Sequence, residues 1–147
     1  MERTMSYRFL EDVAIADVAF EASGKTLVEL FTNAALAVTN TMVNNVGSVE
    51  QKVERSFELE ADDPEMLLYR FLQELVFYKD AELLLFSRYD LDIKREIRKW
   101  RLKATIRGEE LSREKHELGS DVKAVSLHRF HVQKTTQGWK ADVILDV

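Results

Sequence analysis

Cysteine is absent from the 147-residue sequence, which excludes disulfide bonds, thiol catalysis and zinc–thiolate sites and makes a reducing cytoplasm the expected location. No apolar run approaches the roughly 18 residues that a membrane helix needs, and no cleavable signal pattern opens the chain. No association with a membrane is therefore expected. The sequence also contains a single proline and five glycines, and no linker, repeat or low-complexity segment interrupts it.

The sequence has fewer positively charged than negatively charged residues. The chain has 21 Lys and Arg residues against 26 Asp and Glu residues, a net charge of −5. A dominant nucleic-acid groove needs the opposite balance, so no stable direct binding to nucleic acid is expected. The local exception is the basic segment 94–103 (KREIRKWRLK), which we interpret as the solvated turn of a hairpin.

The motifs by which common catalysts are recognised are also missing. The sequence contains no phosphate-binding loop, no Gly-x-Ser-x-Gly elbow, no H-E-x-x-H pair and no dinucleotide fingerprint. This favours an accessory protein over an enzyme.

Hydrophobic periodicity predicts a single α+β domain over residues 1–147, with two amphipathic helices packed on a largely antiparallel β-sheet. The first helix follows Gly24 and begins with the capping box Thr26–Glu29, and the second begins at Asp63-Pro64. Alternating apolar and polar residues predict the strands. They cover residues 7–10, 13–21, 56–61, 89–93, 99–107, 122–133 and 139–147.

Two aspartates near opposite ends of the chain are candidate metal ligands. Asp17 lies in an otherwise apolar strand, where a lone carboxylate is costly unless it is paired, bound to a cation or exposed at the strand end. Asp146 precedes Val147, whose terminal carboxylate would supply further oxygen atoms if the natural chain ends there. Hard divalent cations prefer such oxygen ligands. A solvent-facing aspartate at a strand end is the simpler alternative for Asp17.

Three further residues could contact a partner protein. Lys123 interrupts an apolar run and is either a salt-bridged or extended surface lysine, a partner contact, or a lysine held near the acidic site. Glu109 allows the same choice between an internal ion pair and a partner contact. His128 is the third candidate. It lies three residues from His131, so the two point to opposite faces of a strand and a zinc site is not expected.

Four stretches, in order and spanning nearly the whole chain, carry a resemblance to a known family. The segment 108–128 contains GEEL, KHE and VKAVSLH, and it resembles the archease pattern GE-x-L, KHE, VKA-(I/V)-(T/S)-(Y/L)-H. The segments 16–18 (ADV), 63–75 (DPEMLLYRFLQEL) and 139–147 (WKADVILDV) are similar to three other archease motifs. One departure is that the family's His-Thr before Ala-Asp is replaced by Ala14-Ile15.

The resemblance implies a function and a site. Archeases hold a divalent metal, calcium or magnesium/manganese, at positions that match Asp17, Asp146 and Val147. They act as protein cofactors of the GTP-dependent RNA-splicing ligase of tRNA splicing, promoting its guanylylation and multiple turnover. The resemblance thus implies that the RNA-splicing ligase is the partner. The alternative is a chaperone-like module that modulates tRNA-modifying enzymes such as a tRNA methyltransferase.

Overall fold

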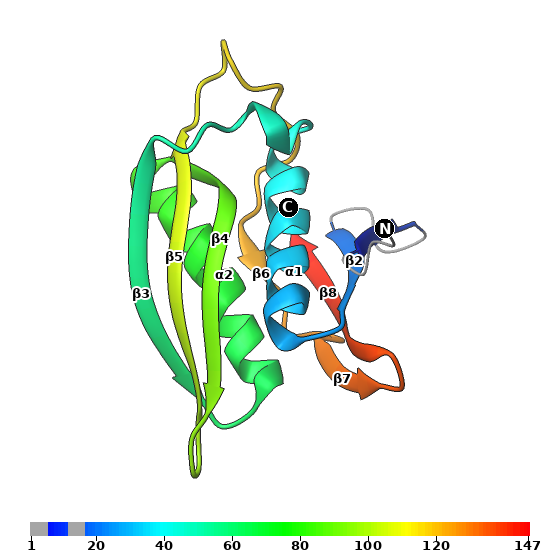
Figure 1. Ribbon diagram of the computed structural model, residues 1–147. Helices are drawn as coiled ribbons and strands as arrows, with labels where there is room; N and C mark the ends of the chain where they lie inside the picture. The colour runs from blue at the N-terminus through cyan, green and yellow to red at the C-terminus, as the bar shows by residue number, and fades with distance from the viewer. Residues whose placement is uncertain (1–5, 12–16) are drawn as a thin grey trace.

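The computed structural model describes residues 6–11 and 17–147 and contains two antiparallel sheets with two long helices (Figure 1). The elements in chain order are β1 (Ser6–Leu10), β2 (Asp17–Gly24), α1 (Leu27–Met42), a 3-10 turn η1 (Val46–Ser48), β3 (Val53–Ala61), α2 (Pro64–Glu82), β4 (Leu84–Arg95), β5 (Trp100–Glu110), β6 (Ala124–Val125), β7 (His131–Thr135) and β8 (Gly138–Asp146). One sheet has the order β1-β2-β8-β6, with β7 also paired to β8, and the other has the order β3-β5-β4. The predicted α+β class is confirmed, and the strands form two sheets.

Both predicted helix starts are confirmed by their caps. The Thr26 side chain accepts a hydrogen bond from the Glu29 backbone N–H (3.2 Å), and the Glu29 carboxylate accepts one from the N–H of Lys25 (2.9 Å). At α2, Asp63 accepts a hydrogen bond from the Met66 N–H (2.8 Å), and Pro64 occupies the first helical position. These bonds satisfy N–H groups that a helix start leaves without an intrahelical partner.

The helices contact strands of both sheets and share one hydrophobic core with them. Figure 1 shows α1 lying between the two sheets, with α2 along the three-stranded one. Phe31 of α1 stacks on Phe71 of α2 with ring centroids 5.8 Å apart, and both rings are fully buried. Because the helices cover the inner faces, each sheet turns its outer face to solvent. Neither described helix is long and apolar enough to cross a membrane.

The segment 122–133 is not the single strand that its alternation predicts. The described chain forms the two-residue β6, then a turn closed by the Phe130 N–H and the Leu127 carbonyl (3.2 Å), and then β7. Phe130 is buried edge-to-face against Tyr69, with centroids 5.5 Å apart. An inward aromatic anchor thus interrupts the strand, a tertiary contact that the local pattern does not contain.

Other predicted strands are confirmed with longer bounds, as in β4 and β5. The final hairpin is confirmed with Thr136 and Gln137 as its loop and Gly138 at φ 139°, in the left-handed region that favours glycine. The predicted strand 13–21 begins at Asp17 in the described part of the chain, and residues 13–16 lie outside it.

Candidate functional site

The two candidate metal ligands form a cross-strand pair. In the antiparallel register of β2 and β8, Asp17 lies directly opposite Asp146. Directly opposite residues have Cβ atoms about 4.5–5.5 Å apart and project on the same face of the sheet. The neighbouring pair Val18–Leu145 faces the core, where Leu145 is fully buried, so both aspartates point to the outer face.

This pair juxtaposes like charges without compensation. Neither carboxylate forms an ion pair with any residue in the ranges 6–11 and 17–147. Like charges directly opposite in a sheet are destabilising, and a bound cation would reverse the sign of that interaction. The donor chemistry therefore suits a hard divalent cation.

Two carboxylates alone are a sparse metal site. No group of three or more His, Cys, Asp or Glu side chains that could hold a metal ion occurs among the described residues. Val147 follows Asp146 directly and is half-buried, so it lies at the same sheet end as the pair. The predicted set Asp17, Asp146 and Val147 is thus brought together by the fold, while Ala14 and Ile15 lie outside the described residues.

Lys123 is placed beside this pair. Its backbone N–H donates to the carbonyl of Asp146 (2.8 Å), and the next residue, Ala124, pairs with Asp146 in the sheet. The Lys123 side chain is exposed and forms no ion pair within the described chain. This position is compatible with a lysine near the acidic site, with an extended surface lysine and with a partner contact, and no salt bridge of Lys123 occurs within the described residues.

Glu109 lies inside the protein, with 6 % of its surface exposed. Its carboxylate accepts hydrogen bonds from Lys115 Nζ (2.9 Å) and from the backbone N–H of Glu50 (2.7 Å), and it is 3.1 Å from His116 Nε2. Burial by itself raises the pKa of Glu109, but these donors outweigh burial and lower it to about 2. The internal ion pair, rather than an exposed partner contact, is what the structure contains.

His116 completes this buried cluster in a defined tautomer. The backbone N–H of Ser112 donates to His116 Nδ1 (2.9 Å), so Nδ1 is an acceptor and the ring proton is on Nε2, directed at Glu109. The histidine side chain is fully buried. Through Glu109, the cluster connects Lys115 and His116, in the polar segment after β5, to the Glu50 N–H in the loop before β3. These contacts stabilise the fold.

A second ion-paired cluster, around a buried lysine, was not predicted from the sequence. Lys79, near the end of α2, is 5 % exposed, and its Nζ lies 2.5 Å from the carboxylates of both Asp80 and Asp121. Burial lowers the pKa of Lys79, but the hydrogen bonds to the two aspartates outweigh it and raise the pKa. Asp121 is far from Lys79 in the sequence, and no local pattern indicates the contact.

His128 lies in the exposed turn between β6 and β7, and its backbone N–H donates to the Ser126 hydroxyl (3.0 Å). The next residue, Arg129, was not singled out by the sequence. It has φ 58°, in the left-handed region, and it lines a depression of about 240 Å³ on the outer face of β8 together with Ile144 and Asp142.

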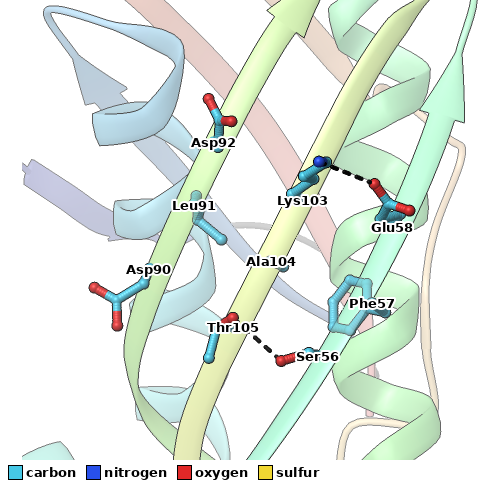
Figure 2. Close-up of a pocket in the computed structure, with 9 residues that line it drawn as sticks. All are labelled: Ser56, Phe57, Glu58, Asp90, Leu91, Asp92, Lys103, Ala104 and Thr105. Carbon is cyan, nitrogen blue, oxygen red and sulfur yellow. Dashed lines mark hydrogen bonds and ion pairs between the residues drawn. The ribbon is translucent and has the colours of Figure 1, made fainter.

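Another hollow lies on the outer face of the three-stranded sheet. It measures about 770 Å³ and is lined by residues of β3, β4 and β5. Figure 2 shows Lys103 directed at Glu58 (3.7 Å) and Thr105 directed at Ser56 (3.2 Å) across its floor. Asp90 and Asp92, which also line this surface, form ion pairs with Arg107 and Lys94, so it presents no charged group that lacks a partner.

Known proteins resemble this chain over most of its length. Residues 7–147 match the model of the Archease protein family (MTH1598/TM1083). The Protein archease of Pyrococcus abyssi is 38 % identical over 133 residues, which are 90 % of this chain and 93 % of that protein. The Protein archease of Archaeoglobus fulgidus is 37 % identical over 145 residues, 97 % of this chain and 100 % of that protein.

Two solved structures share the fold. The solution structure of Methanobacterium thermoautotrophicum protein 1598 is 39 % identical, covers 96 % of this chain and 98 % of its own, and superposes with a TM-score of 0.83. The crystal structure of an archease from Thermotoga maritima, described as a possible chaperone, is 18 % identical with a TM-score of 0.61 over 91 % of this chain and 93 % of its own, a likeness in fold alone. The prediction that the chain is not an enzyme agrees with the family match. The chain belongs to the archease family.

Proposed function

We propose that this protein is a cytoplasmic protein cofactor of the GTP-dependent RNA-splicing ligase in tRNA splicing and RNA repair, and that it promotes the guanylylation and multiple turnover of that enzyme. The observation that carries the proposal is the cross-strand pair Asp17–Asp146 on an exposed sheet face. Membership of the archease family supports it. The proposed site holds a divalent cation, calcium or magnesium/manganese, between the two aspartates, with Val147 at the same sheet end.

The role of this chain's own residues follows from their position. Asp17 and Asp146 lie on the outer face of a rigid sheet, and neither is engaged by an ion pair within the described residues, so both carboxylates are free to reach a partner. A divalent cation held there would supply charge screening for nucleotide phosphates in the ligase active site. The net charge of −5 also suits a partner whose RNA-holding surface is basic, because complementary charge speeds encounter.

A ligation assay tests the proposal. The cognate ligase is used at a concentration well below that of RNA and GTP, with and without this protein, and product per ligase molecule is measured. We expect turnovers to rise well above one with the unaltered protein and to fall back to about one with Asp146→Asn or Asp17→Asn.

Asp92→Asn is the matched control, because it removes one carboxylate from the outer face of the other sheet and should leave stimulation unchanged. Full stimulation by both variants of the pair would rule out the proposed site. No stimulation by the unaltered protein would rule out the ligase as partner.

A chaperone-like module is the second candidate, favoured by the description of the Thermotoga maritima relative as a possible chaperone. Under that alternative the protein would stimulate or stabilise a tRNA-modifying enzyme such as a methyltransferase. A gain in methyltransferase activity, with no effect on ligation, would support this alternative over the first.

A further inference from the structure

The turn between β6 and β7 presents three large side chains to solvent, next to the strand β8 that carries Asp146. Leu127, His128 and Arg129 are all exposed, and Leu127 has 60 % of its surface accessible. Turns usually carry small or polar residues at such positions. Leu127 is instead an exposed apolar side chain two residues from Arg129, and arginine is among the residues enriched at protein interfaces.

The 127–130 turn is fixed at one end to the sheet and at the other to helix α2. Before it, the Ser126 N–H donates to the carbonyl of Ile144 on β8 (2.9 Å). After it, Phe130 is buried against Tyr69 of α2. The exposed side chains are therefore presented from a rigid support, which reduces the ordering cost of binding.

Arg129 has a backbone conformation that glycine would adopt more easily. Its φ is 58°, and the only other non-glycine residue with positive φ among those described is Leu83. Strained backbone of this kind is concentrated at functional sites. The residue combines this conformation with a side chain that forms no ion pair in the described part of the chain, although Asp142 lines the same depression.

The depression lies on the same face as the acidic pair. Besides Arg129 and Asp142, its outer-face lining consists of Leu10, Ala19 and Ile144 from three neighbouring strands. Ile144 is two residues from Asp146 along β8, a separation of about 7 Å on one face. A partner surface that extends from Asp146 over Ile144 along β8 therefore reaches the 127–130 turn, which is bonded to β8 at Ile144.

We infer that the 127–130 turn is the docking contact that this protein makes with the ligase when the Asp17–Asp146 pair reaches the ligase active site. The inference rests on the proposed function. The matching surface on the ligase is an apolar depression for Leu127, bordered by carboxylate or carbonyl oxygens that accept hydrogen bonds from the Arg129 guanidinium. Docking and metal delivery thus depend on different residues of one face.

The separate roles of docking and metal delivery can be measured by titrating the protein into the ligation assay. Two quantities are fitted, the half-saturating concentration and the maximal stimulation. The double variant Leu127→Ser/Arg129→Gly is expected to raise the half-saturating concentration at least tenfold while the maximum is recovered at saturation. Glycine is tolerated at φ 58°, so this variant keeps the turn. Asp146→Asn should do the reverse, lowering the maximum with little change in the half-saturating concentration.

The matched control is Ile97→Ser/Arg98→Gly at the tip of the β4–β5 hairpin, where Ile97 is 97 % exposed and Arg98 has no ion pair among the described residues. This tip projects at the far end of the molecule from the C-terminus (Figure 1). An unchanged half-saturating concentration in the turn variant, or an equal rise in the hairpin control, would overturn the inference.

Direct binding to the ligase without GTP separates the two proposals. Binding by the unaltered protein that is weakened at least tenfold in the turn variant supports the docking contact, and binding that is equal in both overturns it alone. An effect of Arg129 confined to samples with GTP would place a nucleotide phosphate, not a ligase oxygen, opposite the guanidinium and would overturn that assignment. No binding by the unaltered protein removes the proposed function and this inference together.

Discussion

The outer faces of the two sheets follow the same strand alternation but treat charge in opposite ways. On the three-stranded sheet, each outer-face charge has an oppositely charged neighbour, even where the register sets like charges opposite each other, as at Arg88–Arg107 and Lys94–Arg101. Lys103 lies between Glu58 and Asp92, and Arg107 lies between Glu54 (2.8 Å) and Asp90 (2.6 Å). Each such exposed ion pair contributes little to the free energy of folding. Together, however, they give every one of these charges an oppositely charged partner.

On the five-stranded sheet the same compensation stops before the strand ends. Glu21 is paired with Arg8 (3.5 Å) and Lys140 (3.2 Å), whereas Asp17 and Asp146 at the end of β2 and β8 face each other and form no ion pair within the described residues. The comparison shows that exposure and charge do not distinguish a candidate site from an ordinary surface. A like-charge pair across the register in which neither member forms an ion pair does, because its repulsion costs free energy that a ligand can recover.

The largest expected effect is stabilisation of the protein by divalent cations, and it should depend on the Asp17–Asp146 face and not on the three-stranded sheet. At 100 times its dissociation constant, calcium or manganese should stabilise the protein by about 2.7 kcal/mol, which corresponds to a rise of roughly 5–10 °C in Tm. Thermal unfolding with and without the cation measures it. The rise should vanish in Asp146→Asn and persist in Asp92→Asn. Equal rises in both variants would contradict a site at the acidic pair.

Glu109 differs from the carboxylates on both sheet faces because it is buried. A buried carboxylate needs hydrogen-bond donors or a cation to balance its charge. Glu109→Gln should lower the free energy of unfolding by about 2 kcal/mol at pH 7, since it removes charge-assisted hydrogen bonds from Lys115 and the Glu50 N–H. The pKa of Glu109 falls from 4.5 to about 2 on folding, so its contribution is complete above pH 4.5 and is lost as the pH falls toward 2.

Urea unfolding of the unaltered protein and of Glu109→Gln at pH 7, 4 and 3 measures this dependence. The difference between the two proteins should shrink steadily below pH 4.5. A difference that stays constant over the whole range would mean that shape, and not charge, is what Glu109 contributes.

The compensated face can be converted into a mismatched one by a single substitution. Lys103→Glu places a carboxylate between Glu58 and Asp92 and should destabilise the protein by about 1 kcal/mol at low ionic strength. In 1 M NaCl the loss should fall to a small fraction, because exposed charges are screened. Lys103→Gln, which removes the cation without adding an anion, is the control. A loss that is insensitive to salt would point to packing instead of charge.

The smallest expected effect is on the free energy of unfolding without metal, which should change in opposite directions when a carboxylate is removed from one sheet face or from the other. With divalent cations chelated, Asp146→Asn should raise the free energy of unfolding by up to about 0.5 kcal/mol, because it relieves the repulsion with Asp17. Asp92→Asn should lower it slightly, because Asp92 has cationic neighbours at Lys94 (3.7 Å) and Lys103. Chemical denaturation of the two variants in parallel tests the contrast, and a shared sign would contradict the comparison.

The helices and their starts could be predicted from the sequence because their determinants are local. The side chains of Thr26 and Asp63 each accept a bond from an N–H three residues ahead, and an apolar stripe with helical spacing directs each helix to the core. Strand alternation likewise placed Lys103 and Thr105 on one face of β5. Asp17 and Asp146 were singled out because a carboxylate in an apolar strand is conspicuous and because the archease motifs include them.

Tertiary structure alone decided which groups meet. The pairing of Asp17 with Asp146 depends on the register of two strands from opposite ends of the chain, and a shift by one residue would turn one aspartate toward the core. The burial of Glu109 depends on a lysine, a histidine and a distant backbone N–H arriving together, and the Arg129 conformation depends on Phe130 packing against α2. Hydrogen bonds and periodicity within a segment are encoded by adjacent residues, whereas register, burial and charge compensation arise only when segments pack.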